Sequence, residues 1–192
     1  MRDEPYQRPP QLAAILDDAA LADFTMSCEE RTGSLLATLA ASKPDGRFLE
    51  LGTGVGAGAA WLTSGMTPGS RLTTVEAHDE VQAIARRHLG DDPRIDFVRA
   101  DADTWLTQQQ DTEPFDFAYV DCRPGKYLRL PDLLAILKPG ALYVVDDMLP
   151  QATWPEDHQP RVDGFLERLP EVPNWRATPM NWASGLVIAA RI

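Results

Sequence analysis

The sequence has little cysteine, no excess of basic residues and no long apolar run, and each of these absences excludes a class of protein. Two cysteines, Cys28 and Cys122, are too few for a disulfide framework in a chain of 192 residues, so reduced thiols are expected. The net charge of −11 opposes binding to a nucleic-acid backbone. No segment is apolar over the length of a membrane span, and the opening MRDEPYQRPP contains no apolar signal core. We therefore expect a cytoplasmic protein that binds neither nucleic acid nor membrane.

What the sequence does contain is a regular alternation of apolar runs and amphipathic segments. Apolar runs at residues 47–51, 71–77, 94–100, 115–121 and 141–147 are predicted to be strands. Between them we expect a helix after a glycine turn, a helix over residues 79–89, a short helix near Thr104 and a helix over residues 130–137. This order predicts an α/β fold built from parallel βαβ units. Residues 175–180 and 184–192 are too close for a crossover helix, so they predict an antiparallel hairpin at one edge.

Two further helices are predicted before the first strand. Apolar residues recur at helical spacing from Gln11 to about Phe24 and again from Glu29 to about Ser42. Ser27 and Glu30 have the spacing of a capping box for the second of these helices. Prolines mark loops elsewhere, and the segment PQATWPEDHQP at residues 150–160 is predicted to be either a mobile flap or an ordinary surface connection.

The first strand leads directly into a glycine-rich turn. Residues 48–60 read FLELGTGVGAGAA, so an apolar run with a carboxylate at Glu50 is followed by four glycines at alternate positions. Glycine allows close approach to the backbone, and the N–H groups at the start of a helix attract anions and polar groups. Glu76, at the end of the second strand, is suitably placed to bind the two hydroxyls of a ribose. The pattern predicts a nucleoside-containing ligand, although the spacing differs from the dinucleotide fingerprint.

Carboxylates recur at the ends of the predicted parallel strands. Ligands of open parallel sheets bind beyond the carboxyl ends of the strands. Each carboxylate also has an ordinary interpretation as a helix cap or a solvated turn residue. The residues concerned are Glu50, Glu76, Asp101, Asp121, Asp146 and Asp147. Their position at one end of one sheet favours a binding site.

Six segments, in order and at similar spacing, resemble class I S-adenosylmethionine-dependent methyltransferases of the catechol and caffeoyl-CoA O-methyltransferase type. The segments are LELGTGVG, TVEAHDE, RADADTWL, FDFAYVDCRPGKY, LLAILKPGALYVVDDM and SGLVIAARI. The resemblance implies a Rossmann-like, seven-stranded, mostly parallel sheet with an antiparallel C-terminal strand and helices on both faces. It also implies a single domain over residues 1–192, in which residues 1–45 pack on or cap the cofactor site and residues 46–192 form the core.

Carried over to this chain, the resemblance assigns a cofactor site for S-adenosyl-L-methionine. Glu50 and the turn of Gly52, Thr53, Gly54 and Gly56 would hold the methionine part, Glu76 and Ala77 the ribose, and Asp101 and Ala102 the adenine. Asp121 would also belong to the cofactor site, and Met26 would lie over the cofactor and the reacting methyl, although it could instead be a core methionine. The family also binds Mg²⁺ or another divalent cation, and the corresponding residues here are Asp121, Asp146 and Asp147, whose oxygens suit a hard cation.

The chain departs from the family pattern on the acceptor side. The family's catalytic lysine position is occupied by Pro124, and Lys126 lies two residues further on, so the predicted catalytic residues are Asp121 and Lys126 and the general base stays open. Asp147 replaces a family asparagine. Three carboxylates without a cation would raise one another's pKa, so either a metal neutralises them or one is protonated or turned away. The short N-terminal segment leaves less chain to cover the acceptor, and a homodimer could supply the cover.

Other residues near the predicted site have two interpretations each. His158 could act as a base if it reaches the acceptor, and Trp154 could form a wall for an aromatic acceptor. Cys122 could be a nucleophile, but a small buried residue is the simpler interpretation.

The sequence as a whole predicts methyl transfer to a hydroxyl of a small, aromatic acceptor, with or without a divalent cation. One alternative is a nucleoside-binding protein that has lost catalysis, because the family lysine is missing. A nicotinamide-dependent dehydrogenase is the second alternative, but it explains neither the Asp146–Asp147 pair nor the C-terminal hairpin.

Overall fold

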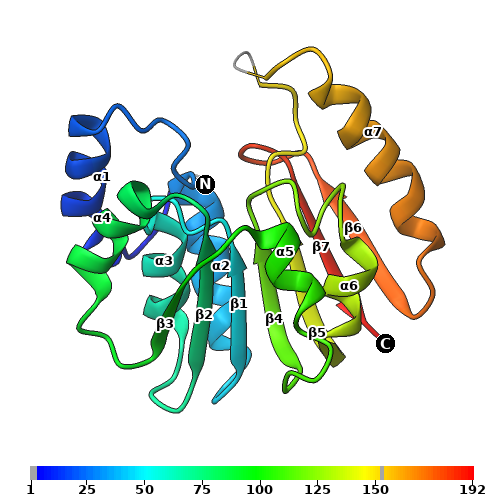
Figure 1. The fold of residues 1–192 in the computed structure, drawn as a ribbon, viewed down its shortest axis with the longest axis horizontal. Helices are drawn as coiled ribbons and strands as arrows, with labels where there is room; N and C mark the ends of the chain where they lie inside the picture. The colour runs from blue at the N-terminus through cyan, green and yellow to red at the C-terminus, as the bar shows by residue number, and fades with distance from the viewer. Residues whose placement is uncertain (1–3, 152–153) are drawn as a thin grey trace.

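The computed structural model describes residues 4–151 and 154–192, which form one seven-stranded sheet with helices on both faces (Figure 1). The strands lie in the order β3-β2-β1-β4-β5-β7-β6. Their bounds are β1 Arg47–Leu51, β2 Arg71–Glu76, β3 Ile95–Arg99, β4 Phe115–Val120, β5 Leu137–Val145, β6 Trp175–Met180 and β7 Leu186–Arg191. The helices are α1 Leu12–Leu21, α2 Glu30–Ala41, α3 Ala57–Gly65, α4 Asp79–Leu89, α5 Ala102–Thr107, α6 Leu130–Ala135 and α7 His158–Arg168, and a 3₁₀ turn, η1, covers Leu169–Glu171.

The pairing of the strands confirms the predicted fold class. Strands β1 to β5 are parallel, and β7 is antiparallel to both β5 and β6. Only a few residues connect β6 to β7, so the second strand must turn back beside the first. The predicted hairpin is therefore present, with β6 at the edge of the sheet and β7 inserted beside β5.

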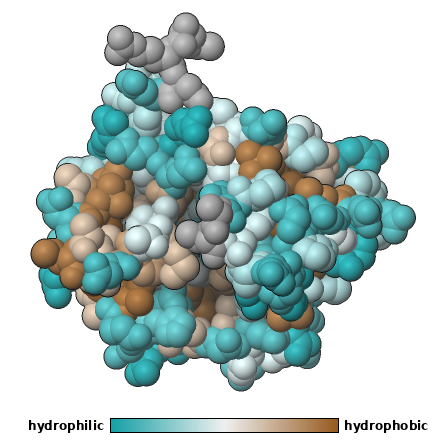
Figure 2. Space-filling model, turned by 90° about the horizontal axis from the view of Figure 1, so that it is seen from above, coloured by the Kyte–Doolittle hydropathy of each residue, from teal (hydrophilic) through white to brown (hydrophobic). Residues whose placement is uncertain are grey.

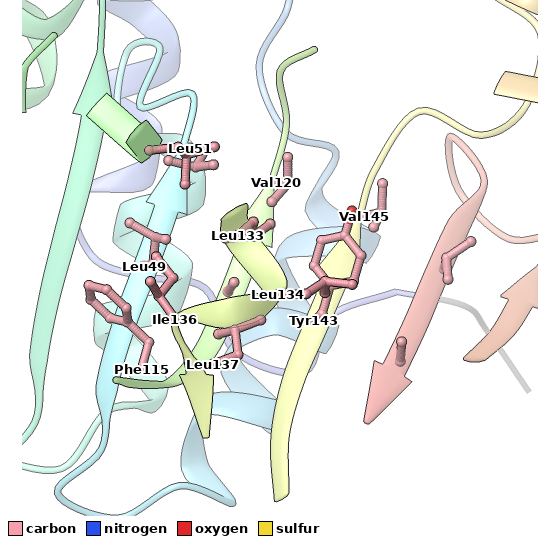
Figure 3. Packing of buried hydrophobic residues seen from close by; sticks show 14 of the residues in the cluster. Leu49, Leu51, Phe115, Val120, Leu133, Leu134, Ile136, Leu137, Tyr143 and Val145 are labelled. Atoms are coloured by element: carbon pink, nitrogen blue, oxygen red, sulfur yellow. The ribbon is translucent and has the colours of Figure 1, made fainter. Parts of the chain in front are cut away.

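Alternate residues of the central strands pack against opposite layers of helices. On one face, Leu49 and Leu51 of β1 lie in a cluster with residues of α5, α6 and α7, and Figure 3 shows α6 packed over β1, β4 and β5. On the other face, Phe48 packs in a cluster with residues of α1, α2, α3 and α4. Both faces of the parallel part of the sheet are buried in this way. The carboxyl ends of its strands are therefore the place where a ligand can bind.

Three local predictions are corrected by the structure. Glu29 is the N-cap residue of α2 and makes no side-chain capping bond, and the Ser27 hydroxyl has no hydrogen-bond partner among the described residues, so the capping box is wrong. The helix predicted over residues 130–137 ends at Ala135, because β5 already begins at Leu137.

The third correction is helix α7, which the sequence interpretation missed. The prolines between residues 150 and 179 are typical of loops, yet Pro160 lies in the first turn of α7. A proline is tolerated there because the first N–H groups of a helix have no partner in any case. Val162 and Phe165, three residues apart, bury this helix against the sheet. The last part of the predicted flap is therefore helical, and its residues 152 and 153 lie outside the described part.

In the part of the chain that the structure describes, no helix is both long enough and apolar enough to cross a membrane.

Candidate functional site

The glycine turn after β1 approaches the neighbouring strand too closely for a side chain. Gly52 has a φ of +96°, and a Cβ atom on it would lie 2.9 Å from the carbonyl oxygen of Asp121. Gly56 has a φ of +95° and is the N-cap residue of α3. Both positions require glycine, because other residues rarely adopt this conformation and there is no space for a Cβ. The turn thus presents bare backbone at the start of a helix, as the sequence predicted.

Glu50 is buried beneath this turn with half of its carboxyl group unpaired. Thr74 Oγ1 donates a hydrogen bond to Glu50 Oε2 at 2.5 Å. Glu50 Oε1 is buried and has no hydrogen-bond partner among the described residues. A Cβ on Gly58 would lie only 2.3 Å from Oε1, so glycine at this position leaves room for the oxygen. Burial, with a contribution from the charge of Glu76, raises the pKa of Glu50 to about 8.

Glu76 links the end of β2 to the glycine turn. Its Oε2 accepts a hydrogen bond from Gly54 N at 2.9 Å. Its Oε1 accepts from the N–H groups of Ala77 and His78 at 2.9 and 3.1 Å. These backbone donors hold the half-buried carboxylate at the mouth of the turn, and a carboxylate with about four acceptor positions can still bind further donors.

A narrow cleft runs along the glycine turn and is closed on the other side by the segment before α2. Its lining comprises Phe24, Met26, Ser27, Cys28, Glu50, Gly52, Thr53, Gly54, Val55, Ala57, Gly58, Tyr119 and Asp121. The structure therefore brings together six of the predicted cofactor residues, namely Met26, Glu50, Gly52, Thr53, Gly54 and Asp121. Gly56, Glu76, Ala77, Asp101 and Ala102 are not part of this lining.

Two of the predicted residues have clear structural surroundings. Met26 is 75% exposed, so the alternative that it is a core methionine is wrong. Asp101 is the N-cap residue of α5, and its Oδ1 accepts a hydrogen bond from Thr104 N at 2.9 Å. The ordinary capping role of Asp101 is thus present, while its predicted place beside an adenine stays a prediction, as does that of the buried Ala102.

A second, wider cavity of about 610 Å³ opens on the far side of Asp121. It is lined by Thr25, Met26, Ser27, Cys28, Glu29, Asp121, Cys122, Arg123, Lys126, Tyr127, Asp146, Asp147, Gln151, Trp154, Pro155, His158 and Ser184. Met26, Ser27, Cys28 and Asp121 belong to both linings, so the cleft and the cavity share one wall. Figure 2 views the molecule from the end of the sheet at which both open, where hydrophilic side chains surround smaller hydrophobic patches.

Aromatic rings form one side of this cavity. The rings of Trp154 and His158 lie 4.2 Å apart between centroids at an interplanar angle of 33°. Tyr127 approaches His158 edge-on, with its hydroxyl 3.4 Å from His158 Nε2. Burial and the positive charges of Arg123 and Lys126 lower the pKa of His158, so its imidazole is neutral at pH 7.

Asp146 is the most tightly held carboxylate of the site. It is 3% exposed, and Tyr119 donates a hydrogen bond to its Oδ2 at 2.8 Å. Its Oδ1 accepts from the Ser184 hydroxyl and, at 2.8 Å, from the N–H of Asp147. Three of its roughly four acceptor positions are thus occupied by protein donors.

Asp121 and Asp147 form a close carboxyl pair beside Asp146. Both side chains line the cavity, and Asp147 has a φ of +60°. Burial and the neighbouring carboxylates raise the pKa of both groups, while the Lys126 ammonium opposes this increase. A raised pKa favours the protonated form, which agrees in direction with the alternative in which one of the three carboxyls is protonated, and that alternative stays a prediction.

The arrangement does not favour a shared metal ion. Across residues 4–151 and 154–192, no group of three or more His, Cys, Asp or Glu side chains is placed so that it could hold one. Asp146 offers little free oxygen, and a lysine ammonium lies beside the pair. These residues as placed do not fit a divalent cation, so the metal site of Asp121, Asp146 and Asp147 stays a prediction without support from the geometry.

Lys126 points into the site although it does not occupy the position of the family lysine. Its side chain is buried, and Nζ donates to the carbonyl oxygen of Asp146 at 2.6 Å. Cys122 is partly buried, and burial raises the pKa of its thiol to about 12, which excludes a ready thiolate. The interpretation of Cys122 as a nucleophile is therefore not supported.

Sequence reasoning missed Tyr119 and Ser184, the two hydroxyl donors to Asp146. The position of Tyr119 could have been inferred from strand alternation. Strands β1 and β4 pair Glu50 with Tyr119, so both side chains point to the same face of the sheet. Ser184 lies in the turn before β7, and no local pattern identifies it.

Comparisons with known proteins support this picture of the fold. A family model described as a methyltransferase domain matches residues 49–148. The catechol O-methyltransferase of Mycobacterium tuberculosis is 30% identical over 148 residues, which cover 73% of this chain and 66% of that protein. Catechol O-methyltransferase B of Danio rerio is 23% identical over 136 residues, or 66% of this chain and 52% of that protein. The chain spans about half the length of most of the curated relatives it matches.

Solved structures show the same fold over nearly the whole chain. The O-methyltransferase of Bacillus cereus, in complex with SAH, superposes with a TM-score of 0.86 at 22% identity and covers 97% of this chain and 93% of its own. TomG of Streptomyces achromogenes, in complex with SAM, gives a TM-score of 0.83 at 24% identity, with coverages of 96% and 91%. The family model spans just over half of the chain, from residue 49 to residue 148, and the chain therefore belongs to the methyltransferase domain family.

Proposed function

We propose that this protein transfers the methyl group of S-adenosylmethionine to a hydroxyl group of a small aromatic acceptor. The observation that carries the proposal is the shared wall of Met26, Ser27, Cys28 and Asp121 between the glycine-turn cleft and the 610 Å³ cavity. Methyl transfer requires a donor and an acceptor side by side in line, because alignment supplies much of the rate enhancement. The names of the relatives, which are O-methyltransferases, support the same reaction.

The residues of the cleft fit the proposed cofactor. The unpaired Glu50 Oε1 is suitably placed to accept a hydrogen bond from the ammonium of the methionine part, and the bare backbone at Gly52 leaves space for its approach. Glu76 would bind the ribose hydroxyls at the mouth. When bound, the cofactor supplies a methyl group already activated by a sulfonium. The chain itself binds and orients the two partners and excludes water from between them.

The other cavity favours a flat, hydroxylated acceptor. The Trp154–His158 pair offers an aromatic wall, and the polar groups around Lys126 lie on the same lining. An aromatic acceptor could pack on the first and place its hydroxyl near the second. A protein without catalysis needs no acceptor cavity, and a dehydrogenase explains neither the Asp146–Asp147 pair nor the C-terminal hairpin.

Two finer proposals concern the state of the protein in the cell. The free thiols of Cys28 and Cys122 suit a reducing, cytoplasmic location. A homodimer would allow a second subunit to help cover the acceptor cavity, and light scattering after size-exclusion chromatography would test this assembly.

Calorimetry combined with a turnover assay tests the proposed reaction. We expect S-adenosylmethionine and its demethylated product to bind, and we expect methylated product by mass spectrometry from a panel of catechols and phenols. Tight NADH binding without a response to S-adenosylmethionine would favour the dehydrogenase. Binding of the methyl donor without turnover of any acceptor would favour the protein that has lost catalysis.

A further inference from the structure

A buried lysine ammonium lies where three carboxyl groups converge. Lys126 is 4% exposed, and lysine is rarely buried to this extent unless it is paired. Its Nζ donates to the Asp146 carbonyl oxygen at 2.6 Å, and its charge acts on both Asp121 and Asp147. An ammonium has three donors, so two remain for groups in the adjoining cavity.

The turn that precedes Lys126 is built to direct this side chain inward. Gly125 has a φ of +87°, and its N–H donates to the Leu128 carbonyl oxygen at 2.6 Å. The buried Tyr143 hydroxyl donates to the Gly125 carbonyl oxygen at 2.5 Å. A Cβ at position 125 would lie 3.0 Å from Leu51 and 3.1 Å from Leu133, so the turn is packed against the core. The ammonium is therefore held by a rigid, buried turn and not by a free surface side chain.

Asp146, whose backbone carbonyl oxygen accepts from Lys126, is 3% exposed, and three of its roughly four acceptor positions are occupied by protein donors. Asp146 receives hydrogen bonds from Tyr119, Ser184 and the N–H of Asp147. Mg²⁺ requires near-octahedral oxygen ligands at short distances, and this buried carboxylate has little free oxygen left to provide one. The ammonium supplies positive charge at the same place.

We propose that the Lys126 ammonium takes the place of a divalent cation and stabilises the acceptor oxygen as an oxyanion. This inference rests on the proposed function. The acceptor O–H bond breaks and its proton leaves to bulk water, while Lys126 donates a hydrogen bond to the resulting oxygen. The oxygen electron pair then forms the C–O bond as the C–S bond breaks, and the bonding pair remains on sulfur as a neutral thioether. Methyl transfer by this protein therefore requires no added metal.

The first test measures metal binding and needs no turnover. We would titrate the chelator-treated protein with Mn²⁺ and follow free Mn²⁺ by electron paramagnetic resonance. The expected result is no uptake at the site by the wild-type protein. Stoichiometric uptake that is lost in Asp146→Ala would overturn the proposal.

The second test uses 4-nitrophenol, whose ionised form has its own visible absorption and which cannot chelate a metal. With chelator present, the wild-type protein should lower the apparent pKa of the bound phenol by about one unit or more, because a nearby positive charge favours the anion. Lys126→Gln should lose this shift and Lys126→Arg should keep part of it. Lys138→Gln is the control, since Lys138 pairs with Asp116 at 2.9 Å outside the cavity and should not matter.

Each outcome of the second test counts for or against the proposal. No shift in the wild-type protein, or a shift that appears only with Mg²⁺, would overturn it, as would a full shift in Lys126→Gln. Neither test contains a methyl donor. A failure of the proposed function, seen as no binding of S-adenosylmethionine by calorimetry, is therefore distinguishable from a failure of this inference.

Discussion

The cofactor cleft and the acceptor cavity share one wall, yet different parts of the chain form most of their linings. The cleft is lined by the glycine-rich segment of residues 50–58, by the segment before α2 and by Tyr119 and Asp121. The acceptor cavity consists of side chains from separate loops after β4 and β5, from the start of α7 and from the segment before α2. Backbone geometry tolerates few substitutions because a glycine at positive φ has no substitute. Side chains from several loops can be exchanged independently, and Asp147, one of the positions at which the sequence differs from the pattern it resembles, belongs to this lining.

The largest expected effect concerns the buried carboxyl on the cofactor side. The pKa of Glu50 is about 8 in the folded protein, against 4.5 as its ordinary value. Between pH 4.5 and about pH 8, Glu50 holds a proton in the folded state that it releases in the unfolded state. The free energy of unfolding therefore falls as the pH rises through this range. Glu50→Gln should remove this contribution of roughly 4 kcal/mol. Urea unfolding of both proteins at pH 5 and pH 8 measures it, and parallel pH dependences would contradict the assignment.

Cofactor binding should be sensitive to the same proton. At pH 7 the Glu50 carboxyl is mostly protonated, and a cationic ammonium beside it favours the ionised form. Calorimetry in buffers of different ionisation enthalpy should show release of close to one proton on binding. Glu50→Gln should show weaker binding and no such release.

The second effect in size is the loss of the Glu76 carboxylate. Glu76→Ala should weaken binding of S-adenosylmethionine by about 1.5–3 kcal/mol, the usual value for a charge-assisted hydrogen-bond partner. The affinity for the acceptor should not change, because Glu76 lies outside the acceptor cavity. Equal losses for both ligands in calorimetry would mean that the two halves of the site are coupled through the glycine turn.

Asp101→Ala is the matched control for Glu76, since it removes a carboxylate from the neighbouring strand end. Asp101 caps α5 through Thr104 N, so its loss should cost about 1 kcal/mol of stability. Cofactor affinity should change by less than about threefold, which is within the range of a surface substitution. A larger loss would support its predicted contact with adenine.

The smallest effect belongs to the aromatic wall of the acceptor cavity. Trp154→Ala removes the ring that stacks on His158 and should weaken acceptor binding by about 0.5–1.5 kcal/mol. Trp154→Phe should recover most of it, and the affinity for the cofactor should be unchanged in both variants. Steady-state kinetics would show the change in KM for the acceptor, and an unchanged KM would remove Trp154 from the binding site.

Much of the fold and of the cofactor cleft follows from the sequence. The helix over residues 79–89 and the strands at 47–51 and 175–180 have their predicted bounds, because apolar periodicity and short-range hydrogen bonding are local properties. For Met26 the sequence allowed both a place at the cofactor site and a place in the core. Only the path of the chain before α2 places it at the wall between the cleft and the cavity. The sequence did not predict helix α7, because Pro160 in its first turn is a residue more typical of loops.

The sequence by itself determined the parallel βαβ units, the antiparallel hairpin and the backbone cradle at Gly52, because each depends on connection length or on the absence of a Cβ. The tertiary structure alone decided the raised pKa of Glu50, the three hydrogen bonds that hold the Asp146 carboxylate and the inward direction of Lys126. These properties arise from burial and from contacts between residues far apart in the chain, such as Asp146 with Tyr119 and Ser184. The energy of a charge depends on its surroundings, and the packed fold is what supplies those surroundings.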